Sequence, residues 1–134
     1  AIIVLVLLVF LGIYQNISFG KFLIENKKTS YLQMKDAFLW IKDNTPKDSV
    51  ILGDGIDPYV IYYGERKVTH FNSSSADEIL SRTDYVVLHS FEHQSKEMLY
   101  YINNKTGSEF IPIKAFFFDE EEKMPAVVIY KINK

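Results

Sequence analysis

Two aspartates follow the first short apolar run that is bounded by turn residues. Asp54 and Asp57 come directly after residues 49–53 (SVILG), which we predict to be a buried strand. Open α/β sheets bind ligands at the carboxyl ends of their strands, where these carboxylates could hold a divalent cation or a sugar hydroxyl. A turn aspartate and a helix N-cap would place the same residues in a structural role. We therefore name Asp54 and Asp57 as candidate ligand-binding residues.

A second pattern with possible chemistry is residues 89–93 (HSFEH), which match H-x-x-E-H, the inverted zinc-protease motif. Zinc would need both histidines one turn apart on a helix, with Glu92 as the base. Here His89 ends a predicted strand, and the next helix is expected to begin only near Ser95. No Ser-His-Asp order or paired-carboxylate spacing is present elsewhere. The sequence predicts no catalytic residues and no metal site.

The turn after the first strand, residues 53–58 (GDGIDP), is the place where an α/β fold would bind a nucleotide. It contains neither a complete G-x-G-x-x-G nor a G-K-[ST] motif. Its two aspartates would also repel a phosphate group from the helix that follows. We therefore predict no cofactor for this part of the chain.

Composition excludes several classes of protein. The sequence has 134 residues, a formal net charge of −2 and no cysteine. A nearly neutral chain lacks the broad basic surface of nucleic-acid-binding proteins, so no nucleic-acid partner is expected. Without cysteine there is no disulfide, no thiolate zinc site and no cysteine nucleophile.

The first fourteen residues (AIIVLVLLVFLGIY) carry no charge, and the first charged side chain is Lys21. We predict that residues 1–20 are the end of a transmembrane helix, cut at its start because the chain begins with Ala, and that residues 21–29 are the linker that leaves the membrane. A buried core helix is the alternative, because the run is shorter than the ~20 residues of a full span.

Residues 30–134 are predicted to form one soluble α/β domain. Helices are expected at 30–42, 57–64, 75–82 and 95–104, and strands at 49–53, 67–71, 84–89, 109–118 and 126–132. This alternation indicates a small Rossmann-like, mostly parallel sheet with an antiparallel C-terminal hairpin, preceded by the truncated transmembrane helix. The core is expected to contain Trp40, Val50, Ile51, Val86, Val87 and Ile129.

Residues 40–52 (WIKDNTPKDSVIL) resemble a W-I-K-x-N-T-P-x-D-x-V-I-L block in multi-spanning membrane glycosyltransferases that use polyprenyl-phosphate-linked sugars. That superfamily includes protein O-mannosyltransferase-like, aminoarabinose-transferase-like and oligosaccharyltransferase enzymes, in which the block follows the last transmembrane helix. Residues 62–68 (YYGERKV), 84–88 (DYVVL) and 126–131 (AVVIYK) are similar to later segments of the same enzymes. The resemblance implies the soluble C-terminal domain of such a transferase.

The resemblance implies a role without catalysis for these residues. The family's catalytic acidic residues lie in its first extracytoplasmic loop, far upstream of this segment. Where oligosaccharyltransferases carry W-W-D-Y-G to grip the acceptor, this chain has residues 53–57 (GDGID). The domain is thus expected to pack on the transmembrane body of the same parent chain and to assist the binding of a glycan or protein acceptor.

The side of the membrane is indicated in two ways that disagree. Lys21, Lys27 and Lys28 would place the domain in the cytoplasm by the positive-inside rule. The resemblance implies the extracytoplasmic face. We follow the resemblance, because the positive-inside rule compares the charges on the two flanks of a helix and this sequence contains only one flank. A membrane-tethered binding or scaffolding module without enzymatic activity is the alternative function. A pilin-like filament subunit is disfavoured by the predicted parallel sheet.

Overall fold

The structure is a computed structural model that describes residues 17, 20–21, 31–91, 94–105, 107–119 and 121–134. The chain divides into two compact units, Ala1–Leu32 and Gln33–Lys134, and every described strand belongs to the second. The predicted membrane helix (1–20) and linker (21–29) fall almost entirely outside the described residues. Among the residues that are described, no helix has both the length and the apolar composition needed to cross a membrane.

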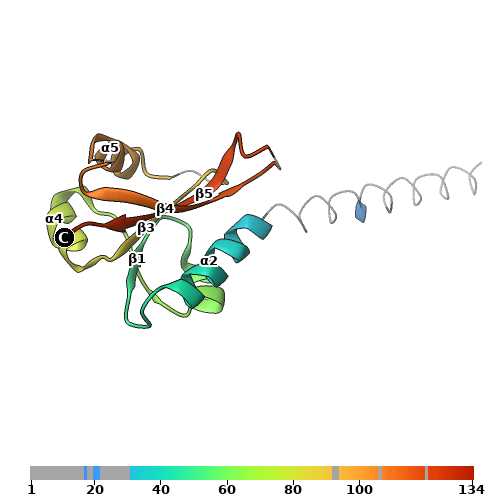
Figure 1. Cartoon of the computed structure of the whole chain (residues 1–134), viewed down its shortest axis with the longest axis horizontal. Coiled ribbons are helices and arrows are strands. Elements are labelled where there is room, and N and C mark those ends of the chain that lie inside the picture. Colours follow the sequence, from blue (N-terminus) through green and yellow to red (C-terminus); the bar gives the residue numbers. More distant parts are fainter. Residues whose placement is uncertain (1–16, 18–19, 22–30, 92–93, 106, 120) are drawn as a thin grey trace, which may run out of the picture. The chain divides into compact units, whose positions relative to one another are not determined.

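The second unit alternates helices and strands, as the sequence predicts (Figure 1). Its elements in chain order are α2 (Leu32–Asn44), β1 (Val50–Leu52), α3 (Asp57–Tyr59), the π-helix η1 (Val60–Gly64), β2 (Lys67–Thr69), the 3-10 helix η2 (Ser73–Ser75), α4 (Ala76–Arg82), β3 (Tyr85–His89), α5 (Lys96–Lys105), β4 (Phe110–Phe117) and β5 (Pro125–Ile132). The expected elements are therefore confirmed, with small shifts at their ends.

The five strands form one mixed sheet in the order β2-β1-β3-β5-β4. Strands β2, β1 and β3 are parallel, whereas β5 runs antiparallel to both β3 and β4. The α/β class and the C-terminal hairpin are confirmed. The last strand lies inside the sheet, because β5 pairs with β3, and the penultimate strand β4 forms the edge.

Helices cover both faces of the sheet. The connection from β1 to β2 and the connection from β2 to β3 run in opposite directions across the sheet, so right-handed crossovers place α3 and α4 on opposite faces. Phe38 of α2 stacks on Tyr59 of α3, with ring centroids 6.2 Å apart, which puts α2 on the α3 face. On the other face, Leu52 and Val86 pack with the buried side chains of α4 and α5.

The predicted core is confirmed at Ile51, Val86, Val87 and Ile129, all of which are fully buried. Val50 and Trp40 are only partly buried, so their predicted places in the core are wrong. Helix α2 instead buries Met34, Ala37, Phe38 and Ile41. These four share one helical face, and Trp40 falls on a neighbouring face of the same helix.

The predicted helix over residues 57–64 is a short α-helical turn followed by the π-helix η1. Its last residue, Gly64, packs on Phe38, and a Cβ atom at this position would lie 3.2 Å from the Phe38 ring. Glu65 then takes a left-handed conformation, with φ of 49°. This reversal directs the next residue, Arg66, back toward the end of α2.

Arg66 carries a buried guanidinium whose acceptors are carbonyl and hydroxyl oxygens. It donates to the carbonyl oxygens of Lys42 and Thr45, both at 2.6 Å, and to Thr45 Oγ1 at 3.1 Å. It also donates to the carbonyls of Gly64 and Glu65. The positive charge thus satisfies carbonyl groups at the C-terminus of α2, where the helix dipole favours a cation.

Asp84 joins the start of β1 to the last residues of the chain. Its Oδ2 accepts from the Val50 N–H at 2.9 Å, and its Oδ1 accepts from Lys134 Nζ at 3.0 Å. Burial by itself would raise the pKa of this carboxyl. The Val50 N–H and the Lys134 ammonium outweigh that effect, so the pKa of Asp84 lies below its ordinary value.

We expect Arg66→Ala to lower the free energy of unfolding by about 2–4 kcal/mol, because buried carbonyl groups lose a charged donor. The control is Arg82→Ala, which removes an exposed pair with Glu78 and should cost less than about 0.5 kcal/mol. Urea denaturation followed by circular dichroism measures both. Equal losses would show that the Arg66 contacts contribute little.

Asp84 should make the free energy of unfolding depend on pH in the acidic range. A carboxyl whose folded pKa is lowered stabilises the fold above its unfolded pKa of about 4, and this contribution disappears as the pH falls through the folded pKa. Asp84→Asn, which keeps an acceptor for Val50, should therefore be less stable than the parent at neutral pH and equally stable in strong acid. Thermal unfolding across that range measures the difference, and a constant gap would contradict the prediction.

Candidate functional site

The carboxyl ends of β1 and β3 form a topological switch point. The two strands are parallel neighbours, with Leu52 opposite Val86. The chain leaves β1 toward β2 and leaves β3 toward α5. Ligands of open α/β proteins bind outside such a pair of strand ends. This edge of the sheet is therefore where we predict a ligand-binding site from the sequence.

The turn after β1 lies tightly against β3 because its first residue is a glycine. A Cβ atom on Gly53 would lie 2.6 Å from the Ile56 side chain and 2.9 Å from the Val87 carbonyl oxygen. Gly55 has φ of 67°, a left-handed conformation that glycine adopts without strain. These two glycines bring Asp54, which lies between them, close to the end of β3.

Asp54 connects the loops that follow β1 and β3. Its carbonyl oxygen accepts a hydrogen bond of 2.8 Å from His89 Nε2. Its Oδ2 accepts from the Ser95 N–H at 2.9 Å, and Ser95 Oγ in turn accepts from the Met98 N–H in α5. The carboxylate therefore holds the start of α5 against the switch point.

Asp57 lies elsewhere on the same edge. It is the first residue of α3, and its Oδ1 is 3.1 Å from Nε2 of His70, which follows β2. The predicted N-cap role of Asp57 is wrong, because the N-cap residue is Ile56 and no side chain caps this helix. Asp54 and Asp57 thus contact different partners, and their use by a ligand stays a prediction.

The H-x-x-E-H pattern is only partly described. His89 ends β3, as expected, and uses Nε2 in the bond to Asp54. Glu92 and His93 lie outside the described residues. Within the described ranges, no group of three or more His, Cys, Asp or Glu side chains gathers in a way that could hold a metal ion.

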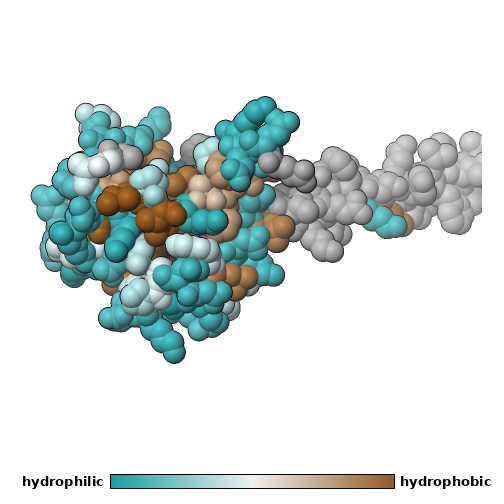
Figure 2. Space-filling model, in the orientation of Figure 1, coloured by the Kyte–Doolittle hydropathy of each residue, from teal (hydrophilic) through white to brown (hydrophobic). Residues whose placement is uncertain are grey.

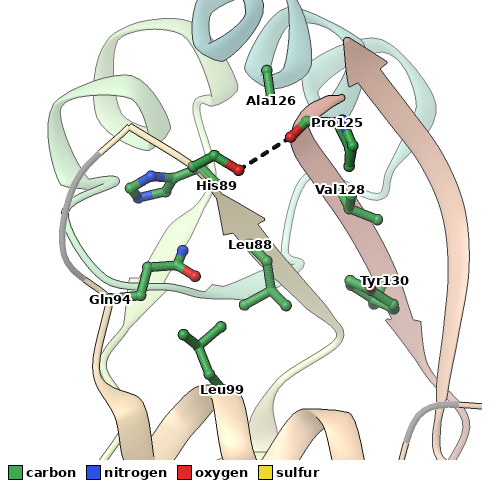
Figure 3. Close-up of a pocket in the computed structure, with 9 residues that line it drawn as sticks. Leu88, His89, Gln94, Leu99, Pro125, Ala126, Val128 and Tyr130 are labelled. Carbon is green, nitrogen blue, oxygen red and sulfur yellow. Dashed lines mark hydrogen bonds between the residues drawn. The ribbon is translucent and has the colours of Figure 1, made fainter. Parts of the chain in front are cut away.

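A pocket of about 280 Å³ opens beside the switch point, between the end of β3, the start of β5 and α5 (Figure 3). We call it the β3–β5 pocket. It is lined by Leu88, His89, Ser90, Gln94, Leu99, Pro125, Ala126, Val128 and Tyr130. Figure 3 shows His89 and Gln94 on one side of Leu88, and Val128 and Tyr130 on the other. At one end, Ser90 Oγ donates to the Pro125 carbonyl at 3.1 Å.

Two buried polar atoms of the pocket residues have no hydrogen-bond partner among the residues that the structure describes: Nδ1 of His89 and Nε2 of Gln94. Because a carbonyl oxygen only accepts, His89 must donate to Asp54 through Nε2–H. A buried polar group without a partner costs about 1–3 kcal/mol. On the opposite wall, burial raises the pKa of the Tyr130 hydroxyl above its ordinary value.

Sequence reasoning found His89 but missed the other pocket residues, above all Gln94 and Tyr130. Tyr130 reaches this place because β5 pairs with β3, opposite Val86. The alternation along residues 126–132 predicts a strand but does not say which strand it joins. Gln94 stands one residue before an expected helix start, and no sequence signal separates it from an ordinary loop residue.

We expect Asp54→Ala to lower the free energy of unfolding by about 1–2 kcal/mol, because the Ser95 N–H loses a charged acceptor. Asp57→Ala is the matched control. Its pair with His70 is largely exposed, so the loss should stay below about 0.5 kcal/mol. Denaturant titration of both variants measures the difference, and a larger effect of Asp57 would contradict these assignments.

Comparisons of the chain with protein-family models, with curated proteins and with solved structures find no match.

Proposed function

We propose that this chain belongs to a multi-spanning membrane glycosyltransferase that uses a polyprenyl-phosphate-linked sugar. In this proposal residues 30–134 are its non-catalytic extracytoplasmic domain, a small Rossmann-like unit preceded by the last transmembrane helix. The observation that carries the proposal is the order of the sequence: an uncharged apolar run over the first fourteen residues, then an α/β domain that begins with the W-I-K-x-N-T-P block.

The resembling segments coincide with parts of the fold that hold it together. Residues 40–52 run from the last turns of α2 to the end of β1. Within them, Thr45 accepts two hydrogen bonds from Arg66, which belongs to the second resembling segment, residues 62–68. A resemblance that includes both partners of a buried contact supports a shared domain more strongly than separate strand patterns do.

The surface is consistent with a domain that packs on a larger body. Ile61 and Tyr62 stand side by side on η1 and are 59% and 76% exposed. Most of the face shown in Figure 2 is hydrophilic, with only limited apolar areas. A neighbouring apolar pair of this size is a suitable contact for the transmembrane body of the parent chain.

A membrane-tethered binding module without enzymatic activity is the second candidate, and the β3–β5 pocket favours it. The pocket lies at the edge where α/β domains bind ligands, and its described lining residues all belong to this domain. A binding module would keep this pocket and have no transfer activity.

The location of the domain is testable because the sequence has no cysteine. We expect a Ser73→Cys variant of the parent chain, exposed on η2, to react in intact cells with a membrane-impermeant maleimide. Val87→Cys, fully buried in β3, is the control and should react only after unfolding. Labelling of the Ser73 variant only after the membrane is opened would place the domain in the cytoplasm and contradict the proposal.

Activity separates the two candidates. Membranes that contain the parent chain should transfer a polyprenyl-phosphate-linked sugar to an acceptor, and deletion of residues 33–134 should reduce the rate roughly tenfold or more through lost acceptor positioning. The control is a variant of the parent chain that lacks a catalytic carboxylate of the first extracytoplasmic loop. This variant shows the transfer rate that remains when the reaction itself is abolished. Absence of transfer with every donor tested would favour the binding module.

A further inference from the structure

Residues 72–74 (NSS) match N-x-[ST], the acceptor motif for an N-linked glycan. The same motif also occurs at Asn16 and at Asn104. A glycan is bulky and hydrophilic, so its acceptor asparagine lies in a surface loop of a protein outside the cytoplasm. Because a three-residue pattern often arises by chance, the local structure of each asparagine decides which of them is an acceptor.

Asn72 lies in the loop between β2 and the 3-10 helix η2, and it is exposed. Its backbone is extended, with φ of −140° and ψ of 118°, and the residue is the N-cap of η2. Its Oδ1 accepts a hydrogen bond of 3.0 Å from the Ser74 N–H. This bond uses only the carbonyl half of the amide. The atom to which a glycan is attached, Nδ2, therefore has no hydrogen bond to any residue that the structure describes.

Ser74 supplies the hydroxyl that the motif requires at its third position. It is exposed, and its hydroxyl group is hydrogen-bonded to no described residue. The bond from its N–H to Asn72 forms an Asx turn, which keeps the third residue of the motif close to the amide of the first. Both groups of the motif are thus available at the surface of the domain.

The surface beside the motif is polar. Ser73, Asp77 and Glu78 are exposed as well. A hollow of about 380 Å³, lined by residues 73–78 and Tyr101, lies next to the motif. A hydrophilic group attached at this position would therefore lie over hydroxyl and carboxylate side chains.

The other two occurrences of the motif lack this local structure. Asn104 is exposed, but it belongs to the last turn of α5 (Lys96–Lys105) and not to a loop. Thr106, the third residue of its motif, lies outside the described residues, and so does Asn16. Asn72 is therefore the acceptor that the described part of the chain supports.

We propose that Asn72 carries an N-linked glycan. In this modification, Nδ2 of Asn72 attacks the anomeric carbon, C1, of a saccharide that is carried on a polyprenyl diphosphate. The Nδ2–C1 bond forms while the bond between C1 and the diphosphate oxygen breaks. The polyprenyl diphosphate leaves with the electron pair of that bond, and one Nδ2 proton passes to a base of the transferring enzyme. The inference rests on the extracytoplasmic location in the proposed function, but it does not depend on whether the parent chain is itself a transferase.

The test is mass spectrometry of the parent chain isolated from the cells that naturally make it. Trypsin, which cleaves after Lys67 and Arg82, releases residues 68–82, and this peptide contains no other N-x-[ST] motif. We expect the peptide to carry the added mass of a saccharide, which fragmentation places on Asn72. Asn72→Asp keeps a side chain that can cap η2 but removes the amide, so this variant should lose the saccharide.

Two substitutions at residue 74 form a matched pair. Both keep the backbone N–H that binds Asn72, so the start of η2 should be preserved. Ser74→Ala removes the hydroxyl and should lower the fraction of modified chains at least about tenfold, whereas Ser74→Thr should retain the modification. Asn104→Gln is the control for the other exposed asparagine and should leave the modification of residues 68–82 unchanged.

A saccharide on Asn72 that is lost in Ser74→Ala and retained in Ser74→Thr supports the proposal. The proposal is overturned if the peptide carries no saccharide. It is overturned equally if the saccharide persists in Asn72→Asp, since the sugar would then be attached to a serine.

The location of the domain is measured separately, by maleimide labelling of Ser73→Cys combined with Ser74→Ala, a variant in which no glycan shields the thiol. Labelling in intact cells together with an unmodified peptide would overturn the glycan alone. Labelling only after the membrane is opened, together with an unmodified peptide, would overturn the proposed location as well.

Discussion

The guanidinium of Arg66 lies where α2, η1 and β2 meet, and the arrangement of these elements depends on it. A buried cation usually has a carboxylate partner, but here the charge is balanced by carbonyl oxygens, two of which belong to the end of α2. The same contacts hold the start of the loop that leads from α2 to β1, because Thr45 directly follows the last residue of α2. Arg66 itself precedes β2, so one side chain sets α2 against both parallel strands at their amino ends.

The carboxyl ends of the strands are organised by a second, weaker set of contacts. Asp54 holds the loops after β1 and β3 together through His89 and Ser95, and this fixes the start of α5. The pocket beside it exists because β5 pairs with β3 and runs antiparallel to it. A strand parallel to β3 at this position would have run in the direction opposite to that of β5. The edge of the α/β half at which a ligand is expected is thus completed by the antiparallel half.

The order of the elements could be predicted from the sequence, whereas the contacts that position the site could not. Periodicity places Met34, Phe38 and Ile41 on one face of α2, and this face is indeed buried. Trp40 is wrongly placed in the predicted core, because the size and hydrophobicity of a side chain do not show on which face of its helix it lies.

The long-range contacts leave even less trace in the sequence. Arg66 reads as an ordinary surface residue between Glu65 and Lys67, and only the left-handed turn before it directs it inward. The pairing partner of β5 and the place of Gln94 depend on contacts between distant residues, which a single sequence does not record.

The π-helix η1 has a consequence for how this domain can change during evolution. A π-helical turn holds one more residue than an α-helical turn, so a single deletion could turn η1 into ordinary helix. Such a deletion would rotate Gly64 away from Phe38 and carry Arg66 out of reach of α2. Insertions and deletions in descendants of this chain should therefore accumulate in the hairpin loop between β4 and β5, and the length of the segment between Val60 and Arg66 should stay constant.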